Sequence, residues 1–383
     1  MRCAAALGLA SVLALGAGAG AAAAAPAPDI AVWIYGAERW AAERIAAELS
    51  RLPAGTRRVY LSVEAGARVL LDDPATAARL GEILDVAHAR GLSVEAMALQ
   101  DPRWIADVPG AERRVRAVLA FNEARRLRGA PGFDGLHFDV EPQTDEAWTC
   151  GAGAARAAIV ARWHALFDRL ARVIRTSVGA SFRITASFPW WIGATSDRMP
   201  RVAPHAWLGA LAEVVLMAYG DPGGPMVGGS AASVLRRLSD ARVWRDVPAG
   251  RGVRVGLATY EYPDAGALAS VMRAVADELG TRAEFRGIAV FAHGHAFDGP
   301  LTGTLEGRVH DRRGHGVPGA VVRAAGHSAR TSSCGSFRLS GLAPGDVDVA
   351  VDAEGFVGHR AVARALGPGR LRQLPVVVLE ERR

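Results

Sequence analysis

Short strand-like runs alternate with longer helical patterns along most of this chain. Such alternation requires parallel strands joined by helical crossovers, so it predicts an α/β fold. The strand-like runs lie at 30–36, 57–66, 92–101, 133–142, 183–191, 212–221, 252–262 and 285–294. The helical patterns lie at 38–51, 75–90, 110–128, 154–178, 230–239 and 265–279.

Eight strands are the number that closes a (β/α)8 barrel, and the length of the segment fits this fold. We therefore expect a TIM barrel over residues 29–299, with no helix after its eighth strand. A doubly wound open sheet is the alternative. That fold needs fewer strands, and no GxGxxG motif follows the first strand here.

The pattern changes after residue 300. The segment 302–381 contains short alternating runs between glycine-rich turns, such as GTLEGRVHD and GSFRLSGLAPG, which predict a small all-β sandwich. Its glycine spacing resembles that of the carboxypeptidase regulatory-like, transthyretin-related domain. The resemblance implies an accessory module, and we expect it to pack on the barrel flank near the first and eighth strands.

The first 25 residues are typical of a secretory signal, because Arg2 precedes an Ala/Leu/Val-rich run and the small residues AAAAAPAP. A retained anchor is the alternative. We expect cleavage near Ala24 and a secreted or periplasmic protein without stable membrane insertion. Cys150 and Cys334 then remain, either paired or as unrelated thiols. Two cysteines make neither a disulfide framework nor a zinc site.

The charge balance excludes some partners. The net charge is +6, yet every basic residue is Arg, and these are spread among acids without a long basic run. No nucleic-acid motif is present, so we predict no nucleic-acid partner. No metal-ligand spacing, P-loop or nucleophile elbow occurs, and we predict no metal, no cofactor and a monomer.

The fourth strand, FDGLHFDVEP at 133–142, carries an ionisable residue at every second position: His137, Asp139 and Glu141. Strand side chains alternate between faces, so these three should face the barrel interior and point toward the C-terminal mouth. Asp139 beside Glu141 can raise the pKa of one carboxyl and keep it protonated near neutrality, as a general acid requires. The alternative is a row of ion pairs, for example Asp139 with an inward Arg, that only fills the barrel.

Other strand ends also carry polar and aromatic residues. The same alternation places these side chains inward on the second, third, fifth and sixth strands: Ser62, Glu64, Glu95, Met97, Leu99, Thr185, Ser187, Met217, Tyr219 and Asp221. Tryptophans lie near the strand ends at Trp104, Trp148, Trp190 and Trp191. Carboxylates bind sugar hydroxyls and indoles stack on sugar rings, so this set predicts a glycan-binding cleft. We assign substrate binding to His137, Asp221, Glu95, Trp104, Trp190 and Trp191.

The fourth strand resembles the DGxDxDxE motif of family 18 glycoside hydrolases, the chitinases and endo-N-acetylglucosaminidases, and the run 216–219 is similar to that family's Met-x-Tyr-Asp. The resemblance implies that Glu141 donates a proton to the glycosidic oxygen. It implies that Asp139 supports the substrate's acetamido group as internal nucleophile, and that Tyr219 orients this group.

The chain departs from the family pattern at three places. His137 replaces the inner Asp, Gly220 precedes the displaced acid Asp221, and Phe291-Ala292-His293 replaces the usual closing Trp. Because of these departures, it stays open whether the substrate is N-acetylated.

Two other functions stay open. Glu141 and Glu261 could form the carboxylate pair of a retaining glycosidase, although Glu261 shares the outward face of the seventh strand. The chain could also be a non-catalytic carbohydrate-binding barrel. The missing Asp at 137 favours that function, and the retained Glu141 opposes it.

Overall fold

The computed structural model describes residues 29–382, apart from 152, 191–208, 220–229, 240–243, 245–246, 263, 292–302 and 367–370. Its first domain is a closed barrel of parallel strands, which confirms the predicted fold class. The strands are β1 (Ile30–Ile34), β2 (Thr56–Ser62), β5 (Ser93–Ala98), β6 (Gly135–Phe138), β7 (Arg183–Pro189), β8 (Glu213–Met217), β9 (Gly252–Ala258) and β10 (Phe285–Phe291). The predicted signal and the segment that follows β10 lie outside the described residues.

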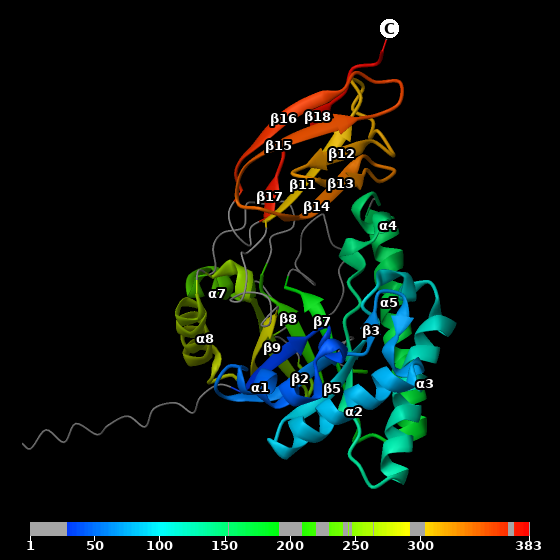
Figure 1. The fold of residues 1–383 in the computed structure, drawn as a ribbon, viewed down its shortest axis with the longest axis vertical. Helices are drawn as coiled ribbons and strands as arrows, with labels where there is room; N and C mark the ends of the chain where they lie inside the picture. The colour runs from blue at the N-terminus through cyan, green and yellow to red at the C-terminus, as the bar shows by residue number, and fades with distance from the viewer. Residues whose placement is uncertain are drawn as a thin grey trace, which may run out of the picture.

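Helices surround these strands (Figure 1). They are α1 (Ile45–Ser50), α2 (Pro74–Ala89), α3 (Val108–Leu127), α4 (Glu146–Thr149), α5 (Gly153–Val178), α7 (Ala231–Ser239) and α8 (Ala265–Leu279). Asp73, Asp107 and Asp264 are the N-caps of α2, α3 and α8, and each carboxylate accepts a backbone N–H of the first turn. No helix in the described part of the chain is long and apolar enough to cross a bilayer.

The pattern of the segment 38–51 predicted one helix, but the structure does not have one continuous helix there. It contains the 3-10 turns η1 (Ala37–Arg39) and η2 (Ala42–Arg44) before α1. Trp40 and Ala41 have extended backbone, with ψ of 132° and 147°, and this interrupts the helical hydrogen bonds. The helix α4 and a small hairpin of β3 (Glu64–Ala65) and β4 (Arg68–Val69) were not predicted.

The second domain is an antiparallel-rich sandwich, as predicted. One sheet contains β14 (Ser336–Leu342), β11 (Gly303–His310) and β17 (Leu371–Gln373), with β18 (Val377–Val378) paired to β11. The other contains β13 (His327–Arg330), β12 (Val321–Ala324), β15 (Gly345–Asp352) and β16 (His359–Leu366). Alternate residues of these strands form a core separate from that of the barrel.

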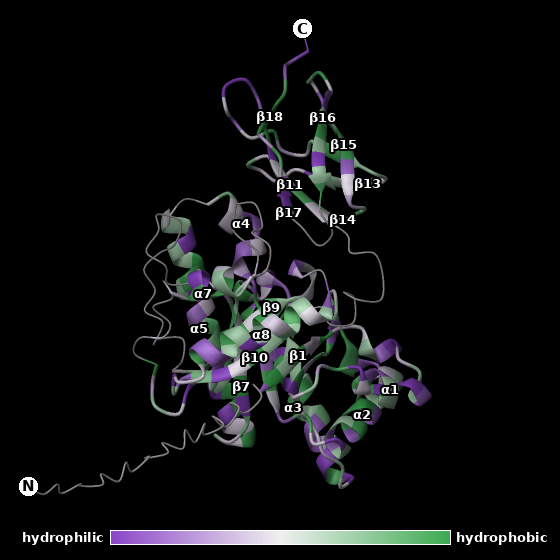
Figure 2. Ribbon diagram, turned by 90° about the vertical axis from the view of Figure 1, so that its left-hand side faces the viewer, coloured by the Kyte–Doolittle hydropathy of each residue, from purple (hydrophilic) through white to green (hydrophobic). Residues whose placement is uncertain are grey.

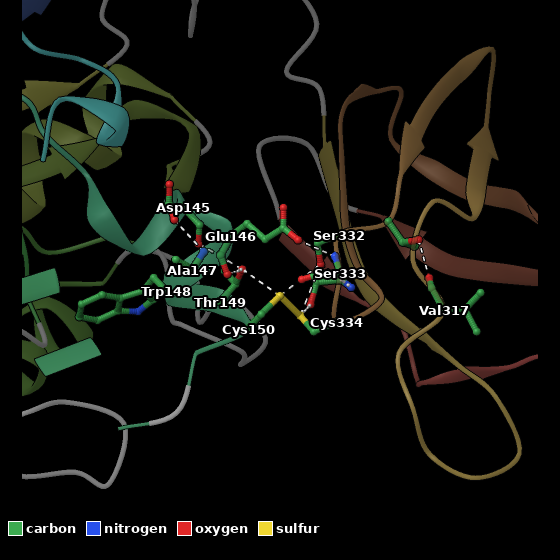
Figure 3. Close-up of a disulfide and its surroundings, with 12 residues drawn as sticks. Asp145, Glu146, Ala147, Trp148, Thr149, Cys150, Val317, Ser332, Ser333 and Cys334 are labelled. Carbon is green, nitrogen blue, oxygen red and sulfur yellow. Dashed lines mark hydrogen bonds between the residues drawn. A yellow bond between two sulfur atoms is a disulfide. The ribbon is translucent and has the colours of Figure 1, made fainter. Parts of the chain in front are cut away.

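The sandwich is joined to the segment that follows β6. Cys150, at the end of α4, forms a disulfide with Cys334 across a Cα–Cα distance of 5.4 Å (Figure 3). Beside it, the backbone N–H of Ser333 donates to the carboxylate of Glu146 at 2.5 Å. Two views show the sandwich beyond one end of the barrel (Figure 1 and Figure 2). Because α4 follows the C-terminal end of β6, this end is the mouth, and the predicted position on the barrel flank is wrong.

Candidate active site

Successive side chains of the fourth barrel strand, β6, alternate between the barrel interior and the layer beneath the helices. Leu136, Phe138 and Val140 are fully buried in the layer between strands and helices. His137 lies inside the barrel, and Asp139 and Glu141 follow on the same side toward the mouth. The strand pairing continues one residue past β6, since the N–H of Asp139 donates to the carbonyl of Ala98 at 3.1 Å.

A cavity of about 410 Å³ opens at the mouth. It brings together Asp139, Glu141 and Tyr219, the three residues predicted to be catalytic. Its other described lining residues are Trp33, Tyr35, Gln100 and Phe291. The rings of Tyr219 and Phe291 are stacked, with centroids 5.6 Å apart and an interplanar angle of 11°. The cavity thus combines a pair of acids with an aromatic wall.

The two acids differ in their surroundings. Burial and the charge of Asp139 raise the pKa of Glu141 to about 8, although Arg338 opposes this shift. Burial also raises the pKa of Asp139, while the hydroxyls of Ser187 and Tyr35 donate to this carboxylate and favour its charged form. The hydroxyl of Tyr35 lies 3.3 Å from Asp139 Oδ2. The charge of Asp139 raises the pKa of Glu141, so Glu141 is the member of the pair that holds a proton near neutral pH.

His137 lies one layer below this pair. Trp33 Nε1, which can only donate, lies 3.2 Å from His137 Nε2, so this nitrogen accepts and the ring proton sits on Nδ1. Nδ1 lies 2.8 Å from the hydroxyl of Thr185, which donates in turn to Glu95. The His137 ring stacks on Tyr60 with centroids 3.9 Å apart. Burial lowers the pKa of His137 to about 3, so the imidazole is neutral.

Ser187 lies between His137 and Asp139. Its hydroxyl donates its one proton to Asp139, and its oxygen lies 2.8 Å from His137 Nε2. His137 is fully buried and is not among the cavity-lining residues of the described chain. The structure therefore places it beneath the acids, with Ser187 between its ring and Asp139.

Glu95 belongs to an ionic cluster at the opposite end of the barrel interior. It is fully buried, and its carboxylate lies 3.3 Å from Arg58 Nε and 3.3 Å from Arg183 Nε. Glu213, at the start of β8, pairs with Arg58 at 3.0 Å and Arg254 at 2.7 Å. Burial opposes its charge, but the nearby guanidinium groups lower the pKa of Glu213 to about 2. These inward arginines neutralise Glu95 and Glu213 at the base, whereas Asp139 at the mouth accepts hydrogen bonds from the hydroxyls of Tyr35 and Ser187.

Among the predicted tryptophans that the structure describes, none lines the cavity. Trp104 is 4 % exposed, and the guanidinium of Arg114 stacks on its ring at 3.6 Å. Trp190 is partly buried just after β7. Trp191 and Asp221 lie outside the described residues. Among the described tryptophans, only Trp33 lines the cavity.

Several lining residues were missed in the sequence. Trp33 and Tyr35 alternate in the first strand, so the alternation applied to the other strands would have found them. Alternation did not predict the inward position of Gln100, because the alternation breaks at Leu99. This residue has a φ of 64° and packs in the outer layer instead of facing inward. The expected inward position of Leu99 is therefore wrong, and Gln100 takes its place.

Glu261 lies on the helix side of the barrel. It is 9 % exposed, and Arg237 of α7 donates to its carboxylate at 3.2 Å. It is not among the described residues that line the cavity with Glu141. Among the described residues, no group of three or more His, Cys, Asp and Glu side chains is arranged to hold a metal ion.

Residues 304–378 match the family model of the carboxypeptidase regulatory-like domain, which confirms the family predicted for the sandwich. No curated protein matches the chain in sequence. Similar solved structures include a chitinase from Chromobacterium violaceum ATCC 12472, with 13% identity, 71% of this chain and 96% of that chain covered, and a TM-score of 0.45.

Two further solved structures are similar at comparable levels. A GH18 chitinase from Pseudoalteromonas aurantia has 10% identity, covers 69% of this chain and 93% of that chain, and has a TM-score of 0.45. An exo-beta-1,4-mannosidase from Opitutaceae bacterium strain TAV5 has 14% identity, covers 69% and 51%, and has a TM-score of 0.48. At these identities the likeness concerns the barrel fold alone.

Proposed function

We propose that this chain is an exported glycoside hydrolase in which Glu141 is the general acid. The observation that carries the proposal is a cavity that Glu141 and Asp139 line together with four aromatic side chains. A carboxyl with a pKa of about 8 keeps its proton at neutral pH and can give it to a leaving oxygen. Aromatic rings offer flat apolar faces to sugar rings, so the same cavity suits a glycan.

The reaction we infer is substrate-assisted. Glu141 protonates the glycosidic oxygen as the bond from that oxygen to the anomeric carbon breaks. The acetamido oxygen of the substrate forms a new bond to the anomeric carbon, and ionised Asp139 stabilises the positive charge on the acetamido group. Tyr219 orients that group. Water then attacks the anomeric carbon as the bond from that carbon to the acetamido oxygen breaks, and water gives a proton to the Glu141 carboxylate, which restores the acid.

The environment of Glu261 favours this mechanism over a two-carboxylate displacement. A nucleophile must reach the anomeric carbon from the cavity, and retaining glycosidases hold their two carboxyls about 5 Å apart. The carboxylate of Glu261 instead pairs with Arg237, which extends from the helix layer. The Cys150–Cys334 disulfide supports export, because such bonds persist in oxidising compartments.

The test is product analysis on a panel of N-acetylated and plain glycans. Glu141→Gln keeps the shape of the side chain but has no proton to give, so turnover should fall by about 10²–10⁴-fold while binding persists. Tyr219→Phe should also be severely impaired, and Glu261→Gln should retain activity. In the wild type, activity should decline as the pH rises through about 8, where Glu141 loses its proton.

Two other results would give the site a different function. Loss of activity in Glu261→Gln with azide rescue, while Tyr219→Phe survives, would establish the two-carboxylate mechanism. Binding without cleavage by the wild type would establish a glycan-binding barrel. That second candidate is favoured by the neutral His137, which stands where the resembling family has an acid.

A further inference from the structure

The sandwich is attached close to the cavity, by the chain segment that leaves Glu141. After Glu141 the chain passes through η5 (Pro142–Thr144) and α4 to Cys150, which is bonded to Cys334. The Ser333 N–H donates to Glu146 in the same segment. The strand β14 starts at Ser336, two residues after Cys334, so the disulfide drawn in Figure 3 ties the start of this strand to the segment that follows Glu141.

Arg338 lies on the face of β14 that is turned away from the sandwich core. Ser336 and Arg338 are on one face by alternation, whereas Phe337 and Leu339 are in the sandwich core. The Ser336 hydroxyl lies 3.3 Å from Cys334 Sγ, on the disulfide that joins the two domains. In both views β14 lies on the barrel side of the sandwich and β16 on the far side (Figure 1 and Figure 2).

Arg338 is held by a neighbour on the same sheet. It is opposite Glu306 of β11 in the register, and its Nη1 lies 3.1 Å from the carboxylate of Glu306. Glu306 faces away from the sandwich core, yet its side chain is only 28% exposed. Burial raises its pKa, although Arg338 opposes the shift. The charge of Arg338 also acts on Glu141.

We propose that the sandwich completes the mouth site, with Arg338 as a positioning residue for the carboxyl of Glu141. The side chain of Arg338 is 61% exposed and pairs with Glu306, and the interdomain disulfide ties the start of β14 to the segment that follows Glu141. This inference rests on the proposed hydrolase function, since it assigns a second domain to the same site. The sandwich is then a component of the active site, and its removal should alter the chemistry as well as the binding.

The charged and titratable groups that face Glu141 in the described chain come from four places. They are Asp139 after β6, Tyr35 after β1, Tyr219 after β8 and Arg338 on β14. Asp139 favours the protonated form of Glu141, and Arg338 favours the ionised form. Removal of the Arg338 charge should therefore make Glu141 harder to ionise.

The test is a ¹³C NMR titration of the Glu141 carboxyl in the full-length chain, together with a pH–rate profile on the glycan panel. In Arg338→Gln the midpoint should move upward by about half a pH unit, as for a partly screened charge. The alkaline limb of the pH–rate profile should move with it. Arg338→Lys keeps the charge and should restore most of the wild-type midpoint.

Two controls complete the design. Arg360→Gln removes the same charge from β16 on the other sheet of the sandwich and should leave the midpoint unchanged. Reduction of the folded wild type should release the sandwich and move the midpoint in the same direction as Arg338→Gln. An unmoved midpoint in both Arg338→Gln and the reduced protein would overturn the proposal. A moved midpoint in a chain that cleaves no glycan would support the role of Arg338 and reject only the hydrolase function.

Discussion

Glu141 gains its affinity for a proton from its surroundings, and the same affinity must appear in the stability of the fold. Its pKa is about 8 in the folded chain, against 4.5 for an unperturbed glutamate. Below pH 4.5 both folded and unfolded states carry the proton. Between pH 4.5 and 8 only the folded state retains it, so ionisation of the unfolded state lowers the free energy of unfolding as the pH rises.

We therefore predict that Glu141→Gln changes the pH dependence of stability. The wild type should lose stability from pH 5 to pH 8, and the variant should lose less, because an amide does not ionise. Urea unfolding midpoints at the two pH values would measure this. Glu43→Gln, at an exposed position of η2, should behave as the wild type does. Equal pH slopes in wild type and Glu141→Gln would contradict the raised pKa.

At the same scale, alternation in the sequence was enough to place Glu141, Asp139 and Tyr219 in one cavity. It could not reveal the environment of His137, because no local pattern shows that Trp33, Tyr60 and Thr185 meet around its ring. Likewise, Glu95 was assigned to the mouth because alternation gives the face of a strand but not the depth along it. Its arginine partners come from other strands, at positions that only the barrel register brings together.

Among the elements, β5 shows how one residue can change the composition of the site. A leucine with a φ of 64° is uncommon, because its Cβ crowds the backbone. The bend is supported by Glu64, which accepts the N–H of Gln100 at 3.2 Å and pairs with Arg114 at 3.0 Å. It directs Gln100 into the cavity, where Leu99 would otherwise lie. Residue 99 is a leucine and not a glycine, so no residue type in the sequence indicated the bend.

The left-handed backbone at Leu99 predicts an unusual order of stabilities. Leu99→Ala removes a buried side chain and keeps the strain, whereas Leu99→Gly removes the side chain and relieves the strain. We expect the glycine variant to be the more stable by about 1 kcal/mol. In Ala98→Gly, at regular strand backbone, glycine should instead cost about 0.5–1 kcal/mol. Urea midpoints give both values, and a less stable Leu99→Gly would exclude the strained bend.

At the scale of the whole molecule, the two domains have separate hydrophobic cores but are joined by a disulfide. The strand and turn patterns predicted both domains, because each fold depends on local periodicity. The pairing of Cys150 with Cys334 was left open, since the two are separated by 184 residues and no local pattern connects them. The disulfide fixes the sandwich at the mouth of the barrel, whereas the sequence had suggested a position on the barrel flank.

This architecture predicts that the disulfide couples the unfolding of the two domains. Closing a loop of this length is worth about 5 kcal/mol in the chain-entropy model. In the oxidised chain, the sandwich and the barrel should unfold in one merged calorimetric transition. With reductant, the tie is lost and each core should melt separately, giving two transitions, the first below the wild-type temperature. The double variant Cys150→Ala/Cys334→Ala should show the same two transitions with and without reductant. If the reduced wild type still melts in a single transition at an unchanged temperature, noncovalent contacts alone join the domains and the disulfide is not the coupling element.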